Sequence, residues 1–209
     1  MIPVKVLAVR YLANATPALC EALRAPKGFP SLGMLTTDCD DATYIALDAA
    51  TKAAEVEVAY GRSFYAGAAN ASTPNAGEVI GILAGPTPAD VKSGMEAALA
   101  ALNRVGFEET NGVPYLAQTV SSVGSFLARE AGVPRGSAVA YLIAPPLEAM
   151  YAMDAALKAS DVRLCKLYAP PSETNFGGGL LTGTQSACDA ACTAFAAAVA
   201  EVAARPKEE

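Results

Sequence analysis

DAATKAAEVEV at residues 48–58 and DAALKASDVRL at residues 154–164 are two copies of one pattern, separated by 154 − 48 = 106 positions. The same separation extends back to Ser31 and Ser137, each of which opens a short apolar run. A repeat of this length, with its members in the same order, indicates that one supersecondary unit occurs twice in the chain.

Two further pairs of glycines extend the repeat with changed spacing. Gly85 and Gly183 each precede an Ala-rich stretch and are 98 positions apart, so the first copy carries eight more residues in the loop before Gly85. Gly28 and Gly132 are 104 positions apart, which predicts two additional residues in the second copy. The longer loop, residues 61–75, is a candidate lid because long loops in compact domains tend to be functional or disordered.

Each copy reads as strand, helix, strand, helix, strand, strand, helix. In the first copy the elements are expected at 4–12, 16–24, 32–37, 43–54, 56–60, 78–84 and 88–102. In the second they are expected at 115–120, 121–131, 138–143, 147–159, 162–166, 180–181 and 185–203, with a linker near 103–113. This order is a ferredoxin-like βαββαβ unit with its last strand and helix moved to the front. We therefore predict an α/β (α+β) protein of two tandem, circularly permuted domains, 1–105 and 106–209.

Composition excludes several classes of function. The 209 residues contain no His, the commonest general base and metal ligand, and no motif for a cofactor or for a nucleophile with its base. A net charge of −6 without a basic stripe argues against a nucleic-acid partner. The longest uncharged apolar stretches, such as residues 190–200, fall short of the roughly 18 residues that a bilayer requires. We therefore expect no catalysis, cofactor, metal site, nucleic-acid partner or membrane span.

The apolar content is nevertheless high. Hydrophobic residues make up 53% of the chain, and the mean hydropathy is +0.29. A chain with this balance and no membrane span is typical of a subunit that buries much surface against neighbours. Five irregularly spaced cysteines and the lack of a secretory signal indicate a reduced, intracellular protein. Cys188 and Cys192, one helical turn apart, are an incomplete zinc set and are expected to be small buried hydrophobes.

The order of elements, with NFGGGL at 175–180, resembles a bacterial microcompartment domain. Longer motifs are similar to the L-type shell proteins of ethanolamine-utilising microcompartments: SLGMLTTDCDDATY (31–44), YGRSFYAGA (60–68), PPLEAMY (145–151) and PPSETNF (170–176). The resemblance implies a structural protein of a cytoplasmic compartment shell. It also implies a homotrimer whose six domains form a pseudohexagonal tile, with other shell proteins edge to edge. The alternative that the residues leave open is a soluble tandem-domain sensor of small molecules.

The resemblance also implies sites. A small passage that binds ethanolamine would use Asp40, Glu78 and Phe107. Two carboxylates suit a primary ammonium because charge-assisted hydrogen bonds are about twice as strong as neutral ones, and an aromatic face adds roughly 0.5–2 kcal/mol. From the residues alone, Asp40 is equally an N-cap, Glu78 a solvated strand-end charge and Phe107 a core residue.

A gated central pore is implied near seven residues: Arg62, Tyr65, Asn175, Phe176, Gly177, Gly178 and Gly179. Without the resemblance, the three glycines would be a tight strand-to-strand turn. Lys52 and Lys158 occupy the same place in both repeats, and the resemblance makes them tile-edge residues. The simpler interpretation is an exposed helix face with Glu55 or Asp161 nearby.

Overall fold

A computed structural model describes residues 1–64, 77–170 and 175–207. The chain forms two compact units. The N-terminal unit comprises residues 3–106 together with 124–127, and the C-terminal unit comprises residues 1–2, 107–123 and 128–209. The expected domain ranges, 1–105 and 106–209, remain a prediction.

The N-terminal unit is a four-stranded antiparallel sheet with helices. Its elements are β1 (Val6–Leu12), α1 (Pro17–Ala22), β2 (Ser31–Thr37), α2 (Asp40–Ala53), β3 (Glu57–Ser63), β4 (Val79–Gly85) and α3 (Pro88–Leu102). The strand order is β1-β2-β4-β3, so the two central strands are the apolar ones. Helices α2 and α3 pack on each other and on β4. Thr87 accepts a hydrogen bond from the Asp90 amide, and Pro88 follows it, which explains why α3 begins there.

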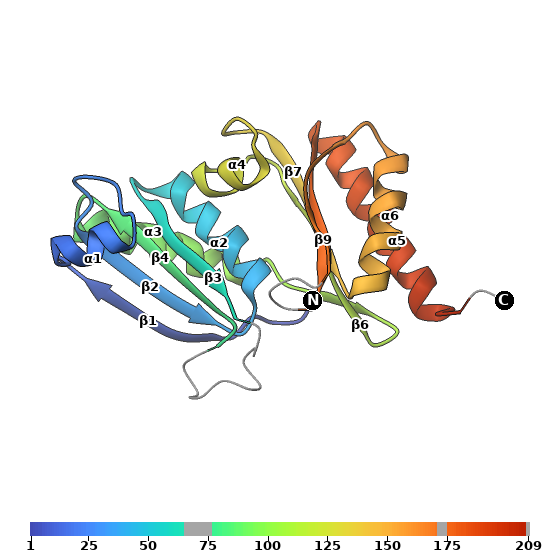
Figure 1. Cartoon of the computed structure of the whole chain (residues 1–209), viewed down its shortest axis with the longest axis horizontal. Helices are drawn as coiled ribbons and strands as arrows, with labels where there is room; N and C mark the ends of the chain where they lie inside the picture. The colour runs from blue at the N-terminus through green and yellow to red at the C-terminus, as the bar shows by residue number, and fades with distance from the viewer. Residues whose placement is uncertain (65–76, 171–174, 208–209) are drawn as a thin grey trace. The chain divides into compact units, whose positions relative to one another are not determined.

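The C-terminal unit repeats this plan with one additional strand. Its elements are β5 (Glu108–Thr110), β6 (Val113–Val120), α4 (Ser125–Ala131), β7 (Ala138–Ala144), α5 (Pro146–Ala159), β8 (Arg163–Tyr168), β9 (Gly177–Gly183) and α6 (Gln185–Ala204). The strand order is β5-β6-β7-β9-β8, again antiparallel. Figure 1 shows α5 and α6 side by side along this sheet. The mixed α/β class and the two successive sheets confirm the predicted fold class.

The core of the C-terminal unit lies between α5, α6 and the sheet. Phe195 is its largest fully buried side chain, packed with β7 and β9 residues such as Leu142 and Leu181. The buried residues of α6 recur every three or four positions, including Cys188 and Cys192, which are indeed core residues. Among the described helices, α6 is also long and apolar enough to cross a membrane by length and composition. Asp189 and Glu201 limit the uncharged stretch of α6 to residues 190–200, and one face of the helix packs in the core of this unit.

The structure differs locally from the expected elements at two places. The expected linker contains β5, joined to β6 by Asn111 and Gly112, whose φ angles of 49° and 78° suit a two-residue hairpin turn. The three glycines at 177–179 are not a turn, because they are the first residues of β9 and lie buried between β7 and β8. A Cβ on Gly178 would lie 1.9 Å from the Leu142 carbonyl oxygen, and one on Gly179 would lie 2.4 Å from that of Lys166. Close backbone approach inside the sheet requires glycine here.

Before β2 and β7, the two copies correspond with a different offset from the one that the sequence indicated. Left-handed turns occur at Arg24 (φ 57°) and Gly28 (φ 87°) in the first copy, and at Gly132 (φ 63°) and Gly136 (φ 86°) in the second. Both 132 − 24 and 136 − 28 equal 108, so Gly28 corresponds to Gly136 and the first copy carries the additional residues. The separation of 106 holds from α2 to β3, because α2 and α5 are both 14 residues long and start 106 positions apart.

Candidate functional site

Three carboxylates lie around the start of α2. Asp40 and Asp41 are its first two residues and are each only 7% exposed. Glu78 precedes β4, and its amide donates to the Thr37 carbonyl at the end of β2 (2.8 Å). The structure therefore brings the two predicted acidic site residues, Asp40 and Glu78, into the same part of the N-terminal unit, together with Asp41.

The pKa of the Cys39 thiol is affected by the carboxylates around the start of α2. Burial raises the pKa of Cys39 far above its ordinary value, and the charges of Asp41, Asp40 and Glu78 raise it further. All three carboxylates thus act on one partly buried thiol. Carboxylates gathered in this way can accept hydrogen bonds from a small cation that donates them.

Hydroxyl groups hold the backbone of this site in place. The side chains of Thr37 and Thr43 both donate to the Cys39 carbonyl (2.9 and 2.7 Å), and their oxygens lie 2.7 Å apart. Cys39 is the N-cap of α2, and the Asp40 side chain accepts from the Asp41 amide at 2.9 Å. The alternative in which Asp40 caps the helix is therefore wrong. Asp40 lies inside the first turn, where the helix dipole favours a negative charge.

Phe107 belongs to the C-terminal unit, where its ring meets that of Phe176 edge to face, with centroids 5.6 Å apart. The sequence assigned Phe107 to a small passage and Phe176 to the central pore, yet the structure pairs them. Phe107 also lies half-buried, with its carbonyl accepting from the Ile2 amide (2.5 Å). Asn175, just before Phe176, is exposed with a positive φ of 65°.

The remaining pore candidates divide by location. Arg62 lies on β3, exposed, opposite Ile80 of β4. Tyr65, and most of the candidate lid, lie outside the described residues. Gly178 and Gly179 pair with both β7 and β8, and Gly177 pairs with β7, so all three glycines belong to the sheet.

The equivalent lysines differ in their surroundings. Lys52 pairs with Asp48 at 3.3 Å, and Lys158 pairs with Asp154 at 2.5 Å, in each case with the carboxylate four residues earlier on the same helix. Asp48 is fully buried, whereas the Asp154 side chain is 64% exposed. The repeat therefore places one pair inside the protein and the other on its surface.

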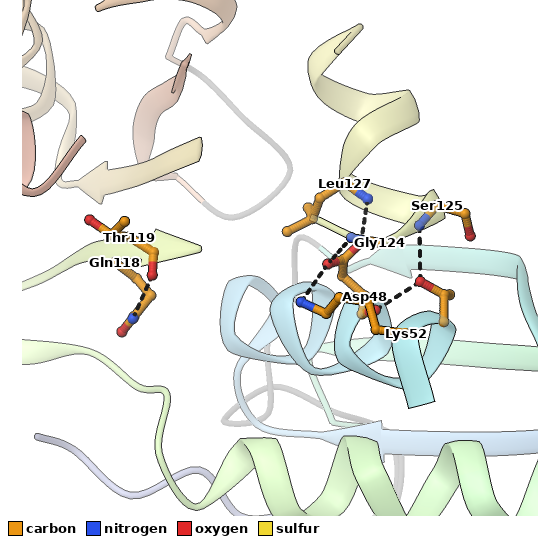
Figure 2. A network of polar contacts seen from close by, with 8 residues as sticks. Asp48, Lys52, Gln118, Thr119, Gly124, Ser125 and Leu127 are labelled. Atoms are coloured by element: carbon orange, nitrogen blue, oxygen red, sulfur yellow. Dashed lines mark hydrogen bonds and ion pairs between the residues drawn. The ribbon is translucent and has the colours of Figure 1, made fainter. Parts of the chain in front are cut away.

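Figure 2 shows what buries Asp48. Its carboxylate accepts from the amides of Gly124 (2.8 Å) and Leu127 (2.9 Å), at the start of α4. Next to it, the Thr51 hydroxyl accepts from the Ser125 amide at 3.0 Å. All these residues belong to the N-terminal unit. Nothing in the local sequence distinguishes Asp48 from Asp154, and sequence reasoning missed this contact.

No group of three or more His, Cys, Asp or Glu residues in the described part of the chain is arranged to hold a metal ion.

Comparison with known proteins identifies the family. The model of the BMC domain matches residues 31–114, beginning at β2 and so after β1 and α1. The chain is 58% identical to the bacterial microcompartment shell protein EutL of Clostridium perfringens and 49% identical to EutL of Escherichia coli, in each case over 96% of this chain and 94% of the relative.

Solved structures agree. The crystal structure of the ethanolamine utilization protein EutL from Leptotrichia buccalis superimposes with a TM-score of 0.96 at 57% identity, covering 100% of this chain and 98% of that one. A trimeric bacterial microcompartment shell protein, PduB, has the same fold with a TM-score of 0.79 at 19% identity, covering 96% and 90%. The match to EutL spans both units, with their permuted order of strands and helices, and the chain therefore belongs to the EutL family of bacterial microcompartment shell proteins.

Proposed function

We propose that this shell protein assembles as a homotrimer, whose six modules form a pseudohexagonal tile with a gated central pore and smaller passages. As a member of the EutL family, the chain is a structural component of an ethanolamine-utilisation microcompartment in the cytoplasm, not an enzyme. This membership removes the soluble sensor that the residues alone left open.

One observation carries the trimer: a single module occurs twice in each chain, with the same strand order around its central strands. Three chains supply six such modules, and closed rings are the usual arrangement of soluble homo-oligomers. The mass of the protein in solution, measured by light scattering, tests the number. Flat sheets in electron micrographs at higher concentration test the tile, and a monomer that forms no sheets contradicts both.

The acidic cluster is proposed as the small passage for ethanolamine. Asp40 and Glu78 would accept hydrogen bonds from the ammonium group, and Asp41, which is equally buried, adds a third charge. The resemblance assigns Phe107 to the same passage as its aromatic residue, since cations are attracted to aromatic faces by about 0.5–2 kcal/mol.

Calorimetry with ethanolamine tests this site, with ethylene glycol as a neutral analogue of similar size. We expect Asp40→Asn and Glu78→Gln to weaken ethanolamine binding about tenfold each, because each removes one charged acceptor. Glu96→Gln is the control, because Glu96 is an exposed carboxylate on α3 (64%). Equal binding of ethylene glycol and ethanolamine, or an effect of Glu96→Gln as large as the others, would contradict the assignment.

The central pore is proposed to lie near Arg62, Tyr65 and the segment from Asn175 to Gly179. The exposed, left-handed Asn175 and the neighbouring Phe176 support it, since both stand at the entry to β9. We keep Gly177–Gly179 in the pore segment because they directly follow Phe176, although their backbones belong to the sheet. Deleting the additional residues of loop 61–75 is expected to alter the passage of small molecules through sheets of tiles, and unaltered passage would remove the lid.

Lys52 and Lys158 are proposed as edge residues that contact other shell proteins. Lys52 keeps 36% of its side chain exposed although its carboxylate partner is buried, and Lys158 is 75% exposed. Lys52→Ala and Lys158→Ala together are expected to abolish sheets while leaving the mass of the single tile unchanged.

A further inference from the structure

One face of α2 is covered within the chain, and the equivalent face of α5 is not. On α2, Asp41, Ile45 and Asp48 follow one another at helical spacing and are 7%, 6% and 0% exposed. The repeat separation of 106 places Leu147, Tyr151 and Asp154 at the same positions of α5. Leu147 is 63% exposed, Tyr151 is 43% exposed and the Asp154 side chain is 64% exposed.

The opposite faces of both helices are alike, so the contrast is specific. Thr43, Ala46, Leu47 and Ala50 of α2 are buried, and so are their counterparts Ala149, Ala152, Met153 and Ala156 of α5. Each helix thus packs on its own sheet in the same way, and only the outer face differs. We call the outer face of α5, formed by Leu147, Tyr151 and Asp154, the α5 face.

The segment that meets α2 also has an exposed counterpart. Residues 124–127, which donate to Asp48 and Thr51, include the buried Phe126 and Leu127, and the Phe126 ring lies 5.8 Å from that of Tyr44 on α2. Since the separation before β2 and β7 is 108, these residues correspond to 16–19 at the start of α1. No residue of α1 is buried, and Leu19, the counterpart of Leu127, is 40% exposed.

We infer that the α5 face binds the α1 segment, residues 16–22, of a second copy of this chain, as the outer face of α2 binds the start of α4 within one chain. The inference rests on the proposed homotrimer and names the surfaces that join its subunits. In this contact Leu147, Tyr151 and Leu19 exclude water. Asp154 takes the position of Asp48 toward the start of α1, where the Leu19 amide already donates to the Thr16 hydroxyl (3.4 Å). Tyr151, which also donates to Glu201 at 3.3 Å, is the residue type most often central to such interfaces.

The hydrogen bond between Thr51 and Ser125 supports the pairing of α5 with α1, because both of its members are replaced by apolar residues at the equivalent positions. Within the chain, the Thr51 hydroxyl accepts from the Ser125 amide, and the Ser125 hydroxyl donates to Glu57 at 2.6 Å. At the equivalent positions of the proposed contact, Leu157 has no acceptor and Pro17 has neither an amide hydrogen nor a hydroxyl. At the Thr51–Ser125 pair, donor and acceptor are thus lost together. The counterpart of Glu57 is Arg163, which is exposed.

The replacement of Gly124 by Thr16 affects how closely α1 can approach α5. A Cβ on Gly124 would lie 2.1 Å from the Thr51 hydroxyl and 2.7 Å from the Asp48 carbonyl oxygen. Its counterpart is Thr16, which has a Cβ, although Leu157 removes the hydroxyl. The backbone of α1 must therefore stand slightly farther from α5 than the start of α4 stands from α2.

The two surfaces are different and lie on the same chain, so the contact is head to tail. Such contacts close into rings when the rotation between subunits allows it. The structure thereby assigns a donor surface, α1, and an acceptor surface, α5, to every subunit.

Disulfide cross-linking tests the pairing. We expect Leu19→Cys and Asp154→Cys, combined in one chain and oxidised, to give covalent dimers and trimers on non-reducing gels. Each single variant alone should stay monomeric on the gel, and it also controls for the native cysteines. A mixture of the two single variants should give dimers and no larger species, because each chain then carries one reactive end.

A second test measures how a change of charge on the α5 face affects association of the chains. Asp154→Arg is expected to weaken association at least about tenfold, since it places a cation against backbone amides. Glu96→Arg, an equal charge change at an equally exposed residue, should leave the trimer intact. A wild-type protein that is a monomer overturns the proposed trimer and this contact with it. A trimer that Asp154→Arg leaves unchanged, with no cross-links in the double variant, overturns this contact alone.

Discussion

Replacing Asp48 by Ala should destabilise the N-terminal unit more than any surface substitution. The carboxylate is fully buried and accepts two backbone hydrogen bonds, from Gly124 at 2.8 Å and Leu127 at 2.9 Å. Hydrogen bonds to a charged group contribute about 1.5–3 kcal/mol each, net of the bonds to water that they replace. Truncation also leaves two amides without their acceptor, so we expect a loss of about 3–6 kcal/mol in the free energy of unfolding.

Asp48→Asn refines the estimate. The amide keeps the shape of the side chain and one acceptor oxygen, but its NH₂ group faces the second backbone amide. About half of the loss, roughly 1.5–3 kcal/mol, should therefore remain. The ion pair with Lys52 adds little, because that lysine is 36% exposed and such pairs contribute about 0–1 kcal/mol.

Urea unfolding followed by circular dichroism measures these differences, with all variants at one protein concentration because association stabilises the folded state. Glu96→Ala is the matched control: its carboxylate is 64% exposed and lies 4.0 Å from Lys92, so its loss should stay within about 0.5 kcal/mol. Hydrogen exchange of Gly124 and Leu127 should accelerate in Asp48→Ala before the rest of the sheet opens. A loss below 1 kcal/mol, with exchange at these amides unchanged, would refute the reasoning.

Three further predictions follow from single buried positions. Gly178→Ala should prevent folding of the C-terminal unit, because φ is 145° and the new Cβ would lie 1.9 Å from the Leu142 oxygen; Gly136→Ala, with φ 86° and open space, should lower the free energy of unfolding by only about 1–2 kcal/mol. Burial raises the pKa of Cys192 from 9.0 to about 11, so its thiol should resist alkylation at pH 8. Because the folded pKa is the higher one, the contribution of Cys192 to stability should be full below pH 9 and lost as pH rises through about 11, and Cys192→Ala should reduce that alkaline decline in a thermal melt. Phe195→Ala should lower the free energy of unfolding by about 3–5 kcal/mol by opening a cavity in the fully closed core, measured by urea titration against wild type.

The sequence carries most of the fold because its patterns are local. Proline and threonine mark the start of α3, and the repeat of DAATKAAEVEV marks α2, α5 and the strands after them. The short hairpin at β5 was predictable too, since Asn111-Gly112 is a strong two-residue turn signal. Gly177–Gly179 were not, because glycine disfavours strands, and only the approach of the neighbouring backbones makes it necessary there.

The sites were less accessible from sequence because they depend on contacts over long separations. The pairing of β2 with β4 brings Asp40 and Glu78 into the same part of the N-terminal unit, whereas Phe107 contacts Phe176 across 69 positions. Asp48 and Asp154 have nearly identical neighbours in sequence, yet opposite burial. The difference comes from amides 76 and 79 positions downstream of Asp48, which no local pattern records.

The joint replacement of Thr51 and Ser125 by Leu157 and Pro17 has a consequence for the order of modules in an assembled tile. If α1 of one chain entered the place of α4 on α2 of another, the Thr51 hydroxyl would face a proline that cannot donate to it. Mismatched joints of this kind are disfavoured by unsatisfied polar groups, which is how related surfaces are kept from exchanging partners. In a ring assembled as proposed above, fusing two modules into one polypeptide would let alternate joints carry different chemistry, which six identical single modules could not do.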